Sequence, residues 1–335
     1  MKAILSLMAA WLVAAGLTLT AGQTLEYKPG KGPGKGKHIV FISGDEEYRS
    51  EEGLPMLAKI LSQRHGFKCT VLFPINPDDG TIDPNNQTNV VGLKALATAD
   101  LVVMLLRFRE FPDDQMKYFV DYFNAGKPII ALRTSTHAFA YSRNKQSPYA
   151  QFDWQSKVWP GGFGQHVLGD TWVNHHGNHG SESTRAVFNP ALASSPLLRG
   201  VDDIWGPTDV YGIIHLPADA SILAHGQVLA GMKPSDKGVE GPKNNPMMPL
   251  IWTREYHNDS GKVNRILCTT MGAAPDLQSE GLRRLLVNAS YWAVGLEKKI
   301  PAKANVDYIG NYQPTFFGFG KFKKGVKPEE HELKP

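Results

Sequence analysis

The sequence predicts an α/β protein built on a parallel sheet, with helices on both faces and a long irregular insertion. Two observations carry this prediction. Short apolar runs alternate with amphipathic helical segments over residues 38–132, an order typical of parallel βαβ units. The apolar runs are continuous rather than alternating, as in strands that are buried on both faces.

The first half of the chain supplies four strands and two helices. The strands are the apolar runs 38–43, 67–73, 99–106 and 129–132. Ser50 stands at a helix N-cap position, and Glu51 and Glu52 follow in the first turn, where the helix dipole favours acidic groups. A second helix begins at Pro112 and ends at Gly126.

The second half is less regular. Residues 141–184 are rich in Gly, His, Asn and Trp and form the expected insertion. Strand-like pieces follow at 185–188, 221–229, 249–253 and 265–270. The last helix is expected over residues 276–292, where Leu282, Leu285 and Leu286 share one face.

Four segments make up the chain. Residues 1–22 resemble a signal peptide, with Lys2, an apolar run and small residues at its end. The run is shorter than the roughly 20 residues of a spanning helix. We therefore expect an exported protein, periplasmic or extracellular, with no integral membrane span after cleavage; an uncleaved anchor is the alternative. Residues 23–37 are expected to be a Gly/Pro/Lys linker, 38–296 the α/β domain and 297–335 an irregular C-terminal arm.

The charge is concentrated at the two ends. Lys and Arg outnumber Asp and Glu by 36 to 32, but the excess lies in the linker and in the tail from Lys298 onward. A nucleic-acid-binding protein carries its basic stripe on the fold itself, so no nucleic-acid partner is expected. The sequence does not indicate the oligomeric state.

The chain has two cysteines, Cys69 and Cys268. An exported protein can form disulfides, yet each cysteine lies in a separate strand-like run. The sequence therefore predicts two buried thiols rather than a bridge.

Three polar loops follow predicted parallel strands, at residues 43–49, 107–109 and 133–137. Because the carboxyl ends of parallel strands share one edge, these loops should meet and bind a polar ligand. A carboxylate among Asp45, Glu46 and Glu47 is the candidate acid or base, with Asp45 or Glu46 preferred. The alternative is a set of solvated charges and local ion pairs.

The candidate site has two groups of residues. The catalytic candidates are Asp45, Glu46 and His137. The candidates for substrate binding are Tyr48, Arg49, Arg107, Arg109, Arg133, Ser135, His166, His175, His176, Asp209 and Tyr211.

A histidine cluster offers a metal site as an alternative. His175 and His179 have the i, i+4 spacing that places two imidazoles on one helix face. Gly177 and Asn178 between them favour a loop, so we expect no cofactor and imidazoles that line the ligand pocket instead.

Aromatic residues accompany these loops, and their flat faces suit sugar rings. Core filling is the alternative for each one singly. The residues are Trp154, Trp159, Trp172, Trp252 and the stretch 205–211.

Several stretches together resemble the ThuA-like (trehalose utilisation) family, in particular its exported planctomycete-type branch. They are residues 44–50, 132–139, 161–166, 175–179, 208–211 and 270–274. The family is similar in fold to class I glutamine amidotransferases, so the resemblance implies a flavodoxin-like parallel sheet. The resemblance implies a role in disaccharide or oxidised-sugar metabolism.

The chain departs from these relatives at the turn after residue 132. Amidotransferases carry a cysteine nucleophile there, whereas this turn has Ser135 as its central hydroxyl. Many ThuA-like proteins have a His in the turn and a Gly-His pair near the last strand; here the matches are Arg133-Thr134 and Gly272-Ala273. We therefore expect no amidotransferase activity.

The expected function is binding or conversion of a carbohydrate, a disaccharide or keto-sugar, at the C-terminal edge of the sheet. A non-catalytic sugar-binding protein and a metal-dependent hydrolase are the alternatives.

Overall fold

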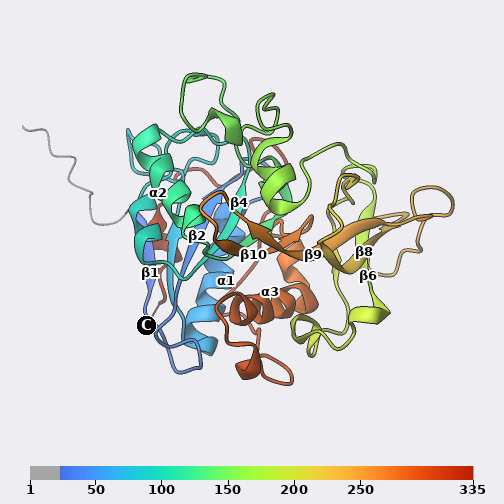
Figure 1. Cartoon of the computed structure of the whole chain (residues 1–335). Helices are drawn as coiled ribbons and strands as arrows, with labels where there is room; N and C mark the ends of the chain where they lie inside the picture. Colours follow the sequence, from blue (N-terminus) through green and yellow to red (C-terminus); the bar gives the residue numbers. More distant parts are fainter. Residues whose placement is uncertain (1–22, 335) are drawn as a thin grey trace, which may run out of the picture.

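The computed structural model describes residues 23–334, which fold around one ten-stranded mixed sheet (Figure 1). The predicted signal peptide lies outside these residues. The strand order is β1-β3-β2-β4-β5-β10-β9-β8-β6-β7. The strands are β1 (Thr24–Tyr27), β2 (His38–Gly44), β3 (Lys68–Leu72), β4 (Leu101–Leu106), β5 (Ile129–Leu132), β6 (Ser183–Phe188), β7 (Trp205–Gly206), β8 (Ser221–Leu229), β9 (Met248–His257) and β10 (Val263–Thr269).

The core of the sheet is parallel, as the sequence predicts. Strands β3, β2, β4, β5 and β10 pair in parallel, and every residue of β2, β4 and β5 is buried. The sheet as a whole is mixed. Strands β9, β8, β6 and β7 extend the sheet antiparallel on one side, and β1 does so on the other.

Helices cover both faces of the sheet (Figure 1). Helices α1 (Ser50–His65) and α3 (Glu280–Ala293) pack on one face and α2 (Asp113–Asn124) on the other. Because successive strand residues point to opposite faces, Ile39 joins the first apolar cluster and Val40 the second. Short helical turns are η1 (Leu93–Thr98), η2 (Arg133–His137), η3 (Ala150–Phe152), η4 (Gly164–Leu168), η5 (Pro190–Leu192), η6 (Pro196–Leu198), η7 (Asp276–Gln278), η8 (Glu297–Lys299) and η9 (Pro328–His331).

Residues 23–37 are not the expected flexible linker. They begin with β1 on the edge of the sheet, and the glycines beyond it pack on the end of α1. The Gly30 and Gly34 amides donate to the carbonyls of Ser62 and His65. A Cβ on Gly32 would lie 2.3 Å from the His65 carbonyl oxygen. These glycines therefore serve close backbone packing rather than freedom of the chain.

The C-terminal arm returns along α1 and β1. The Ile82 amide donates to the Val326 carbonyl, and the Tyr27 hydroxyl donates to the His331 carbonyl at 2.6 Å. The arm thus carries residues from the far end of the chain back to the start of α1.

Two further expectations concern the membrane and the thiols. Within residues 23–334, we find no helix of the length and apolarity that a membrane crossing requires. Cys69 in β3 and Cys268 in β10 are free and buried, as predicted.

Candidate functional site

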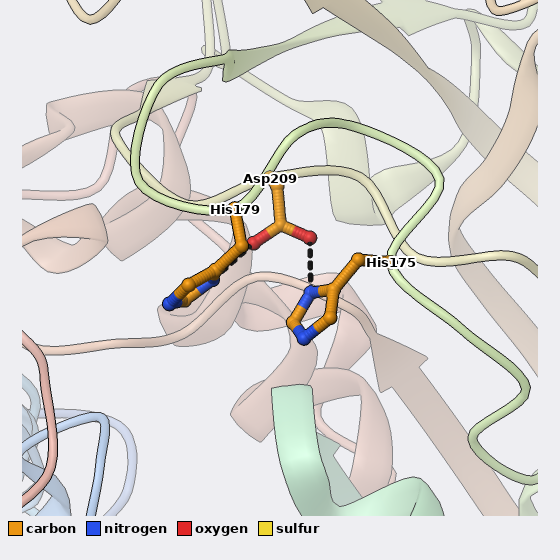
Figure 2. Close-up of side chains that lie close together, drawn as sticks. All are labelled: His175, His179 and Asp209. Atoms are coloured by element: carbon orange, nitrogen blue, oxygen red, sulfur yellow. Dashed lines mark hydrogen bonds and ion pairs between the residues drawn. The ribbon is translucent and has the colours of Figure 1, made fainter.

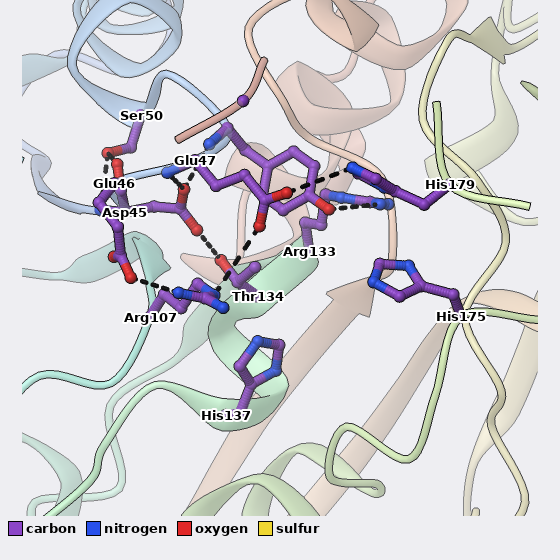
Figure 3. Close-up of polar contacts among 12 residues, drawn as sticks. Asp45, Glu46, Glu47, Ser50, Arg107, Arg133, Thr134, His137, His175 and His179 are labelled. Carbon is purple, nitrogen blue, oxygen red and sulfur yellow. Dashed lines mark hydrogen bonds and ion pairs between the residues drawn. The ribbon is translucent and has the colours of Figure 1, made fainter. Parts of the chain in front are cut away.

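The three polar loops meet at the C-terminal edge of the parallel strands (Figure 3). Glu46, after β2, forms an ion pair with Arg107, after β4. The Thr134 hydroxyl, after β5, donates to Asp45 at 2.5 Å. The structure therefore brings together loops that are far apart in the sequence, as strand order predicts.

Backbone strain marks the same loops. Among residues 23–334, three residues other than glycine have a positive φ: Arg49 at 61°, Phe108 at 51° and Arg133 at 38°. Each lies just beyond a parallel strand. Such conformations cost about 1–3 kcal/mol each and gather at functional sites, which favours this edge as the working part of the molecule.

Asp45 closes the turn after β2. One carboxylate oxygen accepts from the amides of Glu47 at 2.7 Å and Tyr48 at 2.5 Å, and the other accepts from Thr134. The side chain is fully buried. Because local hydrogen bonds occupy both oxygens, the geometry favours a turn-forming role over the acid–base role predicted for Asp45.

Glu46 is held between two guanidinium groups. It pairs with Arg107 and, at 2.7 Å, with Arg109. Burial, with Asp45 nearby, raises the pKa of Glu46 although both arginines oppose the shift. Arg109 also donates to the carbonyls of Pro84 and Asn86. This arrangement fixes the loops and does not favour the acid–base role predicted for Glu46.

Arg49 and Ser135 make internal contacts rather than facing a ligand. The Arg49 guanidinium donates to the carbonyls of Phe316 and Gly318 in the C-terminal arm. The Ser135 hydroxyl donates to the Met104 carbonyl at 3.0 Å. Both side chains therefore join elements of the fold, and the remaining Nη1 of Arg49 is buried 3.7 Å from the Glu51 carboxylate.

Two of the predicted histidines bond elsewhere. The His166 ring stacks on Trp159 at 4.6 Å, and its Nε2 lies 3.0 Å from the Pro160 carbonyl. The Nε2 of His176 lies 2.8 Å from the Lys243 carbonyl. Their rings are engaged in the insertion and the β8–β9 connection, apart from the loop cluster.

Arg133 is the anchor of the site. Its buried guanidinium lies 4.2 Å from the ring centroids of both Tyr48 and Tyr211. It donates to Asp209 Oδ1 at 2.9 Å and to the carbonyls of Asp209 and Thr270. The turn after β5 therefore holds a buried cation that aromatic rings and hydrogen-bond acceptors surround.

Asp209 connects two imidazoles (Figure 2). Its Oδ2 lies 2.7 Å from His175 Nδ1, and its Oδ1 lies 2.9 Å from His179 Nδ1. Burial would raise the pKa of Asp209, but Arg133 and the two histidine hydrogen bonds hold it well below its usual range. An ionised carboxylate only accepts, so both Nδ1 atoms carry a proton.

His179 has a carboxylate on each side of its ring. Besides the bond to Asp209, its Nε2 lies 3.3 Å from Glu47 Oε1. Hydrogen bonds from the ring to these two carboxylates raise the pKa of His179 to about 9, so the ring is a cation at neutral pH. Glu47 is thus a site residue that the sequence did not single out from its two acidic neighbours.

His137 is a neutral imidazole in aromatic surroundings. Burial, together with Arg107 and Arg133, holds its pKa well below the usual range. Its ring lies 5.1 Å from Phe108 and 5.7 Å from Trp172, between ring centroids. The ring can therefore donate or accept a hydrogen bond without carrying charge.

The His175, His179 and Asp209 group also meets the spacing of a metal site, since its ligand atoms lie within 4.8 Å of one another. The distances from Nδ1 to the carboxylate are those of hydrogen bonds. The buried Arg133 already balances the charge of Asp209. These hydrogen bonds account for the arrangement of the three side chains, and the metal site stays an alternative that metal analysis tests.

The aromatic residues divide between site and core. Phe108 and Trp154 line a cavity of about 260 Å³ together with Gln87, Ala140 and Ser142. Trp154 lies 6.1 Å from Trp172 between ring centroids. Trp252, in contrast, is fully buried in the core, as the alternative reading allowed.

The chain is similar in structure to two ThuA-like proteins. That from Parabacteroides merdae has a TM-score of 0.47 and 14% identity over 78% of this chain and 91% of its own. That from Bacteroides uniformis has a TM-score of 0.47 and 15% identity over 80% and 94%. The glutaminase domain of Trypanosoma brucei CTPS has a TM-score of 0.35 and 13% identity over 80% and 98%.

No protein-family model and no curated protein match the chain. The α/β fold with its parallel core therefore rests on the sheet topology itself.

Proposed function

We propose that this protein is an exported enzyme that binds a carbohydrate, a disaccharide or keto-sugar, and converts it by acid–base catalysis, with His175 as the base. The observation that carries the proposal is the Asp209 carboxylate bonded to the Nδ1 of His175 (Figure 2). A carboxylate that orients an imidazole in this way fixes its tautomer and leaves Nε2 with a lone pair.

His175 has the access that a base requires. Its side chain is 36% exposed, whereas Asp209 is fully buried. His179, the other partner of Asp209, is a poorer base because Glu47 occupies its Nε2. His175 therefore has the ring nitrogen that is available to a ligand proton.

Features around His175 support a sugar as the ligand. Trp172 and Tyr211 both lie within 6 Å of its ring, at 5.8 and 5.6 Å. Both also adjoin His137, whose neutral ring can donate a hydrogen bond to a carbonyl oxygen. Flat aromatic faces with polar groups beside them suit the apolar faces and hydroxyl rims of sugars.

Three variants test the base. We expect His175→Gln to lower kcat by at least about 100-fold, the usual size of an acid–base contribution, and Asp209→Asn to lower it as well. His176→Gln is the matched control, because its ring bonds to Lys243. Turnover is measured on trehalose, sucrose, maltose and their 3-keto forms.

Equal activity of the His175 and His176 variants on a converted sugar would contradict the assignment. Activity that a chelator abolishes, together with metal in the purified protein, would favour the metal-dependent alternative at His175, His179 and Asp209.

A non-catalytic sugar-binding protein is the second candidate. The observation that favours it is the turn after β5, where Arg133 is caged and the Ser135 hydroxyl is engaged. Binding of one of these sugars to the wild-type protein without any product would support this candidate over the enzyme.

A further inference from the structure

The C-terminal arm crosses the edge of the site with the segment Thr315–Gly320, Thr-Phe-Phe-Gly-Phe-Gly. Its backbone is tied to the first loop and to α1. The Gly318 amide donates to the Glu47 carbonyl at 2.8 Å, and the Gly318 carbonyl accepts from Arg49. The Thr315 amide donates to Glu52 at 2.9 Å. These bonds give the segment a defined position beside the charged residues of the site.

Phe317 points into the protein. It is 3% exposed, and its ring lies 5.4 Å from both Tyr48 and His179, between ring centroids. It therefore covers the hydrogen bonds between His179 and its carboxylates on one side. This contact makes the arm part of the site's structure.

Phe319 points the other way and is 59% exposed. The guanidinium of Arg107 lies 5.0 Å from its ring centroid and 4.4 Å from that of Phe108. Gly318 and Gly320, on either side of Phe319, have φ of 136° and 68°. Such angles suit glycine, and they let successive phenylalanines face opposite ways.

Phe319 is an exposed aromatic ring beside a charged cluster, where a ligand could pack against it. Within residues 23–334, two large aromatic side chains are exposed, those of Phe316 and Phe319. Both lie in this segment. Phe316 stacks on Phe317 at 4.2 Å between ring centroids. Phe319 instead forms one surface with Arg107 and Phe108.

We propose that Phe319 is a substrate-binding residue, and that its ring packs against the apolar face of a pyranose ring whose hydroxyls are bound by Arg107. A guanidinium offers five N–H donors, and Glu46 engages one nitrogen of Arg107. The rings of Phe108 and Phe319, with centroids 4.4 and 5.0 Å from the guanidinium, help to hold it in place. The inference rests on the proposed function and adds the C-terminal arm to the sugar site.

The test compares Phe319→Ala with Phe316→Ala, which removes the other exposed aromatic ring of the same segment. The probe is whichever of trehalose, sucrose, maltose and their 3-keto forms the wild-type protein binds most tightly by titration calorimetry. We expect Phe319→Ala to raise Kd about threefold to tenfold, the worth of one aromatic contact. Phe316→Ala should bind as the wild type does, and Phe319→Trp should retain affinity.

The outcomes separate this inference from the proposed function. If the wild-type protein binds a sugar and Phe319→Ala binds it equally well, the inference is wrong and the function stands. Equal losses in both alanine variants would assign the effect to docking of the arm and overturn the inference too. If the wild-type protein binds none of the probes, the proposed function and the role of Phe319 both fail. Should Phe319→Ala not fold, Phe319→Leu keeps an apolar side chain and gives the same comparison.

Discussion

At the scale of single residues, the site is a chain of alternating charges across the sheet edge. Each neighbour in this chain lies within 4.0 Å of the next. The chain runs through Arg109, Glu46, Arg107, Glu47, His179, Asp209 and Arg133. Paired charges hold one another in position, so a ligand meets donors and acceptors that are already oriented. Among the described contacts, the Nε2 of His175 has no hydrogen-bond partner, as the proposed base requires.

The charge on His179 predicts a pH-dependent stability. Its pKa is raised from 6.5 to about 9, so the folded state holds the proton more tightly than the unfolded chain. The stabilisation is therefore complete below pH 6.5 and is lost as the pH rises toward 9. We expect the unfolding free energy of His179→Gln to fall below that of the wild type by the largest amount near pH 6. The difference should shrink progressively up to pH 9.5. Chemical denaturation of both proteins across this range measures the difference.

His166→Gln serves as the control for this pH effect. Burial lowers the pKa of His166, whose ring lies apart from the carboxylates, so its variant should not show a penalty that fades between pH 6.5 and 9. A constant difference between wild type and His179→Gln over the whole range would show that the imidazolium does not bridge Glu47 and Asp209.

Sequence reasoning located this cluster but could not assign all its members. Strand ends place Arg107, Arg133 and His137 at one edge. Asp45, Glu46 and Glu47 are consecutive carboxylates, and only the turn geometry decides that Glu47 reaches His179. In the same way, the rings of the neighbours His175 and His176 point to different partners, Asp209 and the Lys243 carbonyl. The insertion has no regular period from which these directions could be predicted.

At the scale of elements, the start of α1 differs from its prediction. Ser50 was expected to cap the helix, but Arg49 precedes the helix in the left-handed conformation without a side-chain cap. The Ser50 hydroxyl instead accepts from the amides of Gly44 at 3.2 Å and Asp45 at 3.1 Å. It also lies 2.8 Å from the Ser43 hydroxyl. Ser50 therefore joins the helix to the end of β2.

Ser50→Ala should consequently destabilise the protein by about 1–3 kcal/mol, since two buried amides lose their acceptor. Ser62→Ala, in the same helix, is the control: its hydroxyl donates within the helix to the Lys59 carbonyl, so the loss should be smaller. Urea denaturation measures both. A smaller loss for Ser50→Ala than for Ser62→Ala would contradict the role given to Ser50.

The core elements could be predicted because burial on both faces leaves continuous apolar runs. The expected strands at 38–43, 67–73, 99–106 and 129–132 all lie within two residues of β2, β3, β4 and β5. Strand β1 was not predicted because Thr24–Tyr27 is four residues long and adjoins a glycine-rich stretch. The antiparallel pairing of the second half was not predicted because contacts between residues distant in the sequence fix it. Strand patterns alone do not give such contacts.

At the scale of the whole molecule, the site lies where the parallel and antiparallel halves meet. The parallel half supplies Arg133 and Glu47, and the connection between β7 and β8 supplies Asp209. A bridge between His175 and Tyr211 joins the insertion to that connection. The antiparallel half thus carries Asp209 and, through this bridge, positions His175 beside the loops of the parallel half.

The same sheet order keeps the two cysteines apart. Three strands separate β3 from β10, so Cys69 and Cys268 lie about 19 Å apart across the sheet, far beyond the roughly 7 Å that a disulfide spans. Burial raises the pKa of both thiols, which further lowers their reactivity. We expect a thiol reagent to modify neither cysteine in the native protein and both after unfolding, and a reducing agent to leave Tm unchanged. The Cys69→Ala variant should label once, at Cys268, after unfolding. Rapid modification of the native protein, or a Tm that falls on reduction, would show that the strands do not hold the thiols buried and apart.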